Sequence, residues 1–373
     1  MKVLVAGDYC PQGRVSDRFM RKDYQSVLGD VKDSISNVDY SIVNLECPIC
    51  SGGEMAIHKC GPNLKCLENG IEAAIWAGFN CFTLANNHFL DYGKEGVKNT
   101  LDACVRNKID KVGGGESLEE ASKTLYKKIE GKIIAVINCC EHEFSIATDT
   151  TAGSNPLNPI QQYYAIKKAR TLSDYVLVIV HGGHEHYQLP SVRMQETYRF
   201  FIDAGADAVV NHHQHCYSGY EYYNDKPIVY GLGNFCFDEG YKGTNLWHEG
   251  YMVEINFSDN ISIVLHPYTQ CAEDAVVKFV SDPTDFKKSI EYLNGIISDA
   301  KLLKEKQNEY YKNSVMSSRL LFEPINFRYA KALQRRGWLP FLHSRYNLTR
   351  IFNYINCEAH RDKVLYALTH LKL

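Results

Sequence analysis

Apolar residues recur in short runs over the first 270 positions, and most runs end at a polar residue or a glycine. Strand-length runs rich in Val, Ile and Leu occupy residues 2–6, 40–45, 79–84, 175–180 and 208–210. Apolar side chains recur at helical spacing over residues 19–35, 64–77, 95–105, 160–172 and 192–204. Antiparallel pairs are predicted later, at 217–223 with 227–231 and at 250–257 with 261–268. This order predicts a layered α/β fold with mixed sheets.

One stretch, residues 84–93, places several polar side chains between a predicted strand and a predicted helix. It reads Leu-Ala-Asn-Asn-His-Phe-Leu-Asp-Tyr-Gly and contains Asn86, Asn87, His88 and Asp91. Ligands bind at this edge in open α/β folds. A buried Asn-Asn-His cluster also needs hydrogen-bond partners or a metal. By itself the stretch is equally consistent with a polar turn that caps a helix.

The other predicted strands also end at ionisable residues. These are Asp8, Glu46, the group His181, His184 and Glu185, and the group His212, His213 and His215. Carboxylates, amides and imidazoles together suit a divalent ion such as Zn, Mn or Fe, not a thiolate-rich structural zinc. His213 and His215 would share one face of an extended segment, although a histidine-rich surface loop is the alternative. His184 and His186 either shape a pocket or lie on its rim.

Composition indicates a soluble globular chain of 373 residues, with 45% hydrophobic and 23% charged residues. The net charge of −3 argues against nucleic acid as a partner of the whole chain. Residues 301–373 hold 14 basic and 5 acidic residues, a net of +9, whereas residues 1–300 hold 27 and 39, a net of −12. This basic, aromatic tail either binds an anionic partner or forms a helical cap on the acidic part. We predict a domain over 1–280 and a helical basic extension over 281–373.

The cysteines and the start of the chain bear on the compartment. There are 13 cysteines, no charged segment followed by a long apolar one at the start, and no apolar run near the ~18 residues that a spanning helix needs. We therefore expect a reducing, cytoplasmic setting without a transmembrane anchor. Cys47, Cys50, Cys60 and Cys66 either form a four-thiol zinc site or belong to a cysteine-rich loop.

Taken together, the motifs resemble the CapA/PgsA family, named for capsule and poly-γ-glutamate synthesis, within the calcineurin-like metallophosphoesterase superfamily. The resemblance covers roughly residues 1 to 270 and rests on Gly7-Asp8, Asn44-Leu45-Glu46, Leu84-Ala85-Asn86-Asn87-His88, Asp91-Tyr92-Gly93, Val112-Gly113-Gly114-Gly115, His181-Gly182-Gly183-His184-Glu185, Gly205-Ala206-Asp207, His212-His213-Gln214-His215 and Tyr230-Gly231-Leu232-Gly233-Asn234-Phe235. It implies a four-layer fold, two packed mixed sheets flanked by helices, with one or two divalent ions (Mn, Zn or Fe) at the strand ends.

The resemblance also implies roles for single residues. The metal ligands would be Asp8, Glu46, Asn87, His181, His213 and His215, with Glu46 bridging two ions. His88 would face the substrate as general acid or transition-state stabiliser, and Asp91 would orient it. The substrate pocket would include His184, Glu185 and Asn234.

The chain departs from the superfamily pattern at three positions. The first motif usually has a histidine two residues after its aspartate, and here that position is Cys10. The bridging position holds Glu46 in place of an aspartate, and Asn211 stands where a glycine often precedes the His-His pair. A single ion held by Glu46, Asn87, His181 and His213 is therefore an alternative to two ions.

These inferences predict a metal-dependent hydrolase in which metal-activated water attacks a phosphoester or related linkage. The substrate would be anionic or polymeric, a phosphoester or a poly-γ-glutamate-like chain, and the partner a surface-polymer biosynthesis machinery. The alternative is a metal-stabilised accessory or binding protein of such a machinery with little turnover, which the cysteine in the first motif favours.

Overall fold

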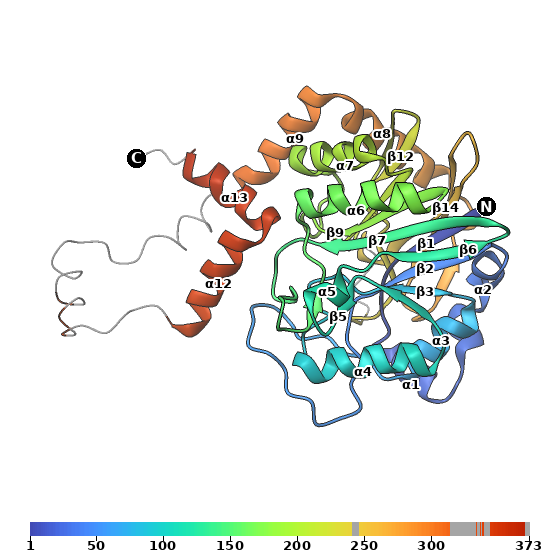
Figure 1. Cartoon of the computed structure of the whole chain (residues 1–373), viewed down its shortest axis with the longest axis horizontal. Helices are drawn as coiled ribbons and strands as arrows, with labels where there is room; N and C mark the ends of the chain where they lie inside the picture. Colours follow the sequence, from blue (N-terminus) through green and yellow to red (C-terminus); the bar gives the residue numbers. More distant parts are fainter. Residues whose placement is uncertain (241–245, 314–332, 334–335, 337, 339–343, 370–373) are drawn as a thin grey trace.

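The computed structural model describes residues 1–240, 246–313, 333, 336, 338 and 344–369 (Figure 1). One mixed sheet has the order β16 (Val277–Phe279), β15 (Ser262–Gln270), β14 (Glu249–Asn256), β1 (Lys2–Cys10), β2 (Tyr40–Leu45), β3 (Cys81–Thr83), β4 (Asp110–Val112). A further strand, β13 (Asn234–Phe237), runs parallel to the end of β1. The strands β1 to β4 are parallel, so their carboxyl ends share one edge.

A second mixed sheet has the order β11 (Tyr220–Tyr223), β12 (Lys226–Val229), β10 (Ala208–His212), β9 (Tyr175–His181), β7 (Lys132–Cys140), β6 (Leu125–Ile129). Its four central strands are parallel, and its two edge strands are antiparallel. A small ladder joins β5 (Gly114–Gly115) to β8 (Gly153–Ser154).

Helices cover the outer face of each sheet (Figure 1). The first sheet carries α1 (Gly13–Met20), α2 (Tyr24–Ser36), α3 (Asn69–Ala77) and α4 (Gly93–Arg106), and the short α5 (Leu118–Ala121) lies beside β5. The second sheet carries α6 (Pro159–Leu172), α7 (Val192–Ala204), α8 (Thr284–Ser298) and α9 (Ala300–Lys312). This arrangement confirms the predicted fold class of two packed mixed sheets flanked by helices.

Strand β1 shows why the predicted strands are continuous apolar runs. Val3 and Val5 belong to the core that includes the second sheet, whereas Leu4 and Ala6 belong to the core beneath helices α1 to α4. Successive side chains point to opposite faces of a strand, and both faces of this sheet are buried. Helix-covered sheets of this kind read as unbroken hydrophobic segments.

Two predicted boundaries differ from the structure. The single helix expected over 19–35 is two helices, because the chain turns between them with Lys22 at a φ of 59°. The first strand does not end at residue 6, because its continuation pairs with two neighbours, Asp8 with Asn234 and Tyr9 with Leu45. Asp8 therefore lies on a rigid paired strand.

The C-terminal part begins with α8 and α9, which bury Ile290, Leu293, Ile297 and Leu303 in the core of the second sheet. Helices α12 (Arg345–Asn356) and α13 (Glu358–Thr369) form a hairpin that extends from the body, and α13 contacts α9 (Figure 1). The sequence also predicts several short helices over 325–373, and the part of that range before residue 344 lies almost entirely outside the described residues. No helix within the described ranges combines the length and apolar character needed to cross a membrane.

Candidate metal centre

The carboxyl ends of strands from both sheets bring the predicted ligands together. Asp8 and Glu46 come from β1 and the end of β2, whereas His181 ends β9 and His213 and His215 follow β10. Strands β1 and β2 are parallel, as are β9 and β10, and β1 contacts β10 across the interface. All five side chains are buried, with Glu46 completely so.

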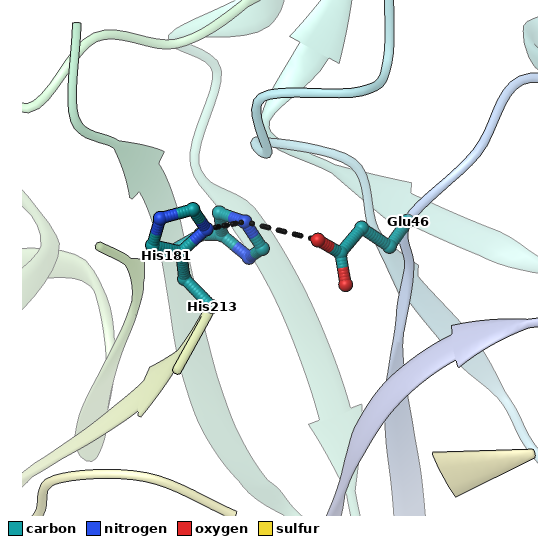
Figure 2. A group of neighbouring side chains, drawn as sticks. All are labelled: Glu46, His181 and His213. Carbon is teal, nitrogen blue, oxygen red and sulfur yellow. Dashed lines mark hydrogen bonds and ion pairs between the residues drawn. The ribbon is translucent and has the colours of Figure 1, made fainter. Parts of the chain in front are cut away.

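The ligand atoms form two groups that share Glu46. Glu46, His181 and His213 place one ligand atom each within 4.8 Å of one another, and so do Asp8, Glu46 and His215. Figure 2 shows both imidazoles of the first group beside the Glu46 carboxylate, with His181 Nε2 3.5 Å from Glu46 Oε1. In the second group His215 Nε2 lies 3.6 Å from the same oxygen. Glu46 thus stands between two clusters of possible ligands.

The Glu46 carboxylate has the surroundings of an ion ligand. Neither of its oxygens accepts a hydrogen bond from the described part of the chain. Burial raises the pKa of Glu46 well above its ordinary value, and the neighbouring charge of Asp8 raises it further. A buried carboxylate without a donor is costly, and a cation between the two clusters would satisfy it. The residues present therefore fit a divalent ion.

His181 is in the form that binds metals. Burial lowers the pKa of His181 well below its ordinary value, and the nearby His213 lowers it further, so the neutral imidazole is favoured. Asn87 Oδ1 lies 3.0 Å from His181 Nε2, on the side of the first group. His213 and His215 have φ values of 90° and 54°, which strain the backbone of non-glycine residues. Such strain is typical of loops whose side chains are held in place for function.

Asn86 holds the turn that presents these groups. Its amide nitrogen donates to the Leu45 carbonyl at 2.8 Å, and its oxygen accepts the His88 N–H at 3.1 Å. Asn86 thereby ties the turn after β3 to the strand that carries Glu46. The sequence indicated a structural role for Asn86 at most, and this position supplies one.

The predicted pair His88 and Asp91 is in contact, at 2.7 Å between Nδ1 and Oδ2. Asp91 also accepts the Leu64 N–H at 2.6 Å and pairs with the buried ammonium of Lys59. Burial lowers the pKa of His88, Lys59 lowers it further, and the Asp91 contact opposes both. Sequence reasoning missed Lys59, which lies in the irregular segment 47–61. The available signal was a lysine that follows the predicted buried Glu46 by 13 positions.

The predicted pocket residues lie in three different surroundings. His184 is buried against α9, with its Nε2 2.8 Å from the Tyr311 hydroxyl. Glu185 is exposed, and its carboxylate forms a further possible ligand group with His213 and His215. Asn234 Oδ1 lies 2.8 Å from His215 Nδ1 and so orients that imidazole.

A cavity of about 390 Å³ lies beside the centre and is lined by His186, Cys216, Glu239, Gly240, Leu246, Trp247 and His248. The Trp247 ring is 5.0 Å from the His215 ring, which places the cavity next to one ligand. Its wall combines an indole, an aliphatic side chain and ionisable groups. A substrate group with both apolar and polar surface fits this lining.

The cysteines contribute no ligand to this centre. Cys10 is completely buried, belongs to neither ligand group, and has a pKa raised by burial to about 11. The possible four-thiol site is not assembled, because within the described ranges no three of Cys47, Cys50, Cys60 and Cys66 come close enough to hold an ion. The alternative interpretation, a cysteine-rich loop beside the centre, is the one that the structure favours.

Comparison with known proteins places this geometry in context. Residues 2–239 match the family described as bacterial capsule synthesis protein PGA_cap. The chain is 28% identical over 317 residues to the capsule biosynthesis protein CapA of Bacillus anthracis, covering 83% of this chain and 76% of that one. It is 32% identical over 227 residues to the PGA biosynthesis protein CapA of Bacillus subtilis strain 168, covering 60% of each. A probable polyglutamine synthesis accessory protein of Mycobacterium tuberculosis is 27% identical over 234 residues, 58% of this chain and 60% of that one.

Two solved structures align with this chain at low sequence identity. A phosphatase from Mycoplasma pneumoniae aligns with a TM-score of 0.44 and 15% identity, covering 79% of this chain and 98% of that one. A putative 5′-nucleotidase from Staphylococcus aureus aligns with a TM-score of 0.43 and 14% identity, covering 79% of this chain and 58% of that one.

Proposed function

The chain belongs to the bacterial capsule synthesis protein family PGA_cap, and from that membership we propose that it is a metal-dependent hydrolase. Its substrate would be anionic or polymeric, a phosphoester or a poly-γ-glutamate-like chain. Its setting would be the machinery that builds a surface polymer. Relatives named for capsule, PGA and polyglutamine synthesis support this process.

One observation carries the proposal: Glu46 is buried, lacks any hydrogen-bond donor in the described structure, and stands between two groups of possible ligands. A structural carboxylate at such a position would be paired with a cationic side chain or with backbone N–H groups. Glu46 has neither, while imidazoles from two strands converge on it. This is the environment that a bridging ligand requires.

The chain supplies ligands for one or two ions. Asp8, Glu46 and His215 would hold one, and Glu46, His181 and His213, with the Asn87 amide oxygen, would hold the other. When bound, such an ion polarises the substrate oxygen and lowers the pKa of water. Asn234 holds His215 in place, and Asn44 donates to Asp8 Oδ1 at 2.8 Å.

His88 would move the proton. In the tautomer that donates from Nδ1 to Asp91, 2.7 Å away, Nε2 would carry the lone pair of the neutral ring. Nε2 can then take up a proton and return it to the leaving group. The Asp91 carboxylate stabilises the imidazolium that forms, and Lys59 keeps that carboxylate in place. Proton transfer of this kind contributes roughly 10²–10⁴ to a rate.

Metal analysis combined with a hydrolysis screen tests this function. The protein should bind at least one divalent ion and hydrolyse p-nitrophenyl phosphate or a γ-glutamyl peptide. Glu46→Gln should lose both properties. Glu196→Gln is the matched control, because Glu196 is exposed on α7. If Glu46→Gln keeps its metal and its activity, the proposed centre is wrong.

A second candidate function is an accessory protein of the same machinery with little turnover. The burial of the centre favours it, because none of the predicted ligand residues is more than 6% exposed. A long polymer cannot reach such a centre without movement. Metal binding without hydrolysis of either probe would support this function over the hydrolase.

A further inference from the structure

A second cluster of side chains that could bind a metal lies where the hairpin of α12 and α13 meets the body formed by the two sheets. Glu143, Cys357 and His360 place a carboxylate oxygen, a sulfur and a ring nitrogen within 4.8 Å of one another. Glu143 follows β7, whereas Cys357 separates α12 from α13 and His360 lies in the first turn of α13. His360 Nε2 is 3.1 Å from Glu143 Oε1. None of these residues belongs to the centre described above.

The hairpin geometry presents these groups on one face. Cys357 and His360 are three positions apart at the start of a helix, so their side chains lie on the same side. Cys357 is 1% exposed, and its sulfur lies 3.9 Å from Glu141 Oε2. The cluster thus lies between two segments more than 200 positions apart in sequence, with Cys357 buried and Glu143 and His360 partly buried.

Asn353 provides an independent sign of a missing ligand. It lies on α12, is 7% exposed, and places its amide nitrogen 3.5 Å from Glu143 Oε1. Its amide oxygen is buried and has no hydrogen-bond partner among the described residues. A buried carbonyl oxygen without a donor is costly, and a turn of the amide that exchanges its oxygen and nitrogen would bring the oxygen toward Glu143, where an ion would remove that cost.

We propose that Glu143, Cys357 and His360 form a zinc site, with the Asn353 oxygen or a water as the fourth ligand. Sulfur, nitrogen and oxygen donors together favour zinc over calcium and magnesium, which take oxygen ligands. Tetrahedral zinc bonds of about 2.0–2.3 Å set ligand atoms about 3.5 Å apart, which is close to the 3.1 Å between His360 Nε2 and Glu143 Oε1. The Cys357 thiol gives its proton to solvent as its sulfur binds the ion.

The site would fasten the hairpin to the loop that borders the first centre. Burial alone would raise the pKa of Glu143, but His360 and a hydrogen bond from Asn87 hold it well below its ordinary value. Glu143 therefore touches both the hairpin and a predicted ligand of the first centre. A zinc ion bound to Cys357 and Glu143 would fix the position of the loop that carries Glu143.

Cobalt substitution of the full-length chain tests the proposal. A cobalt ion bound by a thiolate gives an intense near-ultraviolet charge-transfer band, which imidazole and carboxylate ligands do not give. The chelated protein should show this band on addition of Co²⁺, and Cys357→Ser should abolish it. Cys10→Ser and Cys104→Ser should retain it, because neither thiol belongs to a ligand group within the described residues. A wild-type protein without the band, or a band that persists in Cys357→Ser, would overturn the site.

A second variant and a second readout guard against a folding defect. His360→Gln keeps the thiol and should weaken cobalt binding by about 10-fold or more, as loss of even an outer partner of a ligand does. Zinc should also protect Cys357 from alkylation, mapped by peptide mass spectrometry. Equal alkylation with and without zinc would contradict the proposal. Glu46→Gln should lose the ion of the first centre and keep the band, so failure of one site is distinguishable from failure of the other.

Discussion

Lys59 and His88 are in contact in the folded protein, with 3.0 Å between Nζ and Nδ1, although 29 positions separate them in the chain. The Lys59 side chain is 2% exposed, and its charge is balanced by Asp91, which also lies 2.7 Å from His88 Nδ1. A buried ammonium is stable only when it is paired in this way. Lys59 and His88 therefore share the Asp91 carboxylate, and a substitution of Lys59 should change the pKa of His88.

Lys59→Met should destabilise the protein strongly, because it leaves Asp91 buried with its cation removed. Loss of one partner of a buried pair costs about 3–5 kcal/mol. The pKa of His88 should rise at the same time, since Lys59 lowers it in the native protein. Urea unfolding and a histidine NMR titration measure the two effects. Lys98→Met, which breaks the exposed pair with Asp102, is the control and should change little; equal losses in both variants would contradict this account.

Glu46→Gln should stabilise the protein when metal has been removed. The pKa of Glu46 is raised in the fold, so its contribution to stability is present below its unfolded pKa and is lost as pH rises through the folded value. At neutral pH the glutamine avoids this cost. Thermal melts of chelated samples between pH 5 and pH 8 should show a growing advantage of the variant as pH rises.

Added divalent ion should reverse that order. The wild-type protein should gain about 2.7 kcal/mol when the free ion reaches about 100 times its Kd. Glu46→Gln should gain much less, because the shared ligand of both groups is absent. Melts with and without Mn²⁺ provide the comparison. A gain of the same size in both proteins would show that the ion binds elsewhere.

His88→Gln should lower hydrolysis by roughly 10²–10⁴ while the protein keeps its metal. The variant removes the group that moves the proton and leaves Glu46 and its partners untouched. Steady-state rates and metal content, measured on the same sample, test this separation. His266→Gln alters a histidine on β15 that pairs with Glu254, away from the centre, and should leave both quantities unchanged.

Docking of the hairpin should weaken at alkaline pH. Glu358 raises the pKa of His142, with 2.7 Å between the paired atoms, so the pair stabilises docking at low pH and is lost as pH rises through the folded His142 pKa. Burial alone would raise the pKa of Glu358, but the hydrogen bond from His142 holds it below its ordinary value. The pair is therefore also lost in acid, once the pH falls far enough to protonate the Glu358 carboxylate. Hydrogen exchange of α13, corrected for intrinsic rates, should be faster at pH 8 than at pH 6. His142→Gln should remove the difference.

The sequence was sufficient to predict the residues of the site that lie at the ends of strands. Parallel strands end at one edge, so Asp8, Glu46 and His181 could be expected to meet once their strands were recognised. Lys59 and Glu143 could not be found in this way, because each lies in an irregular segment without periodicity. Cys357 and His360 reach Glu143 only through the docking of a distant hairpin. Contacts of that kind depend on tertiary packing, which local pattern does not encode.

The division of the possible ligands between the two sheets has a consequence for the synthesis of this protein on the ribosome. The carboxylates of the two groups that share Glu46 come from the first 46 residues, whereas their imidazoles come from residues 181 to 215. A ribosome adding about 5–20 residues per second reaches His215 roughly 10–30 s after Glu46. During that interval the nascent chain would carry Asp8 and Glu46 without their histidine partners, and carboxylates alone discriminate little among divalent ions. In the proposed centre, selection of the ion would therefore wait until the second sheet has been made and docks.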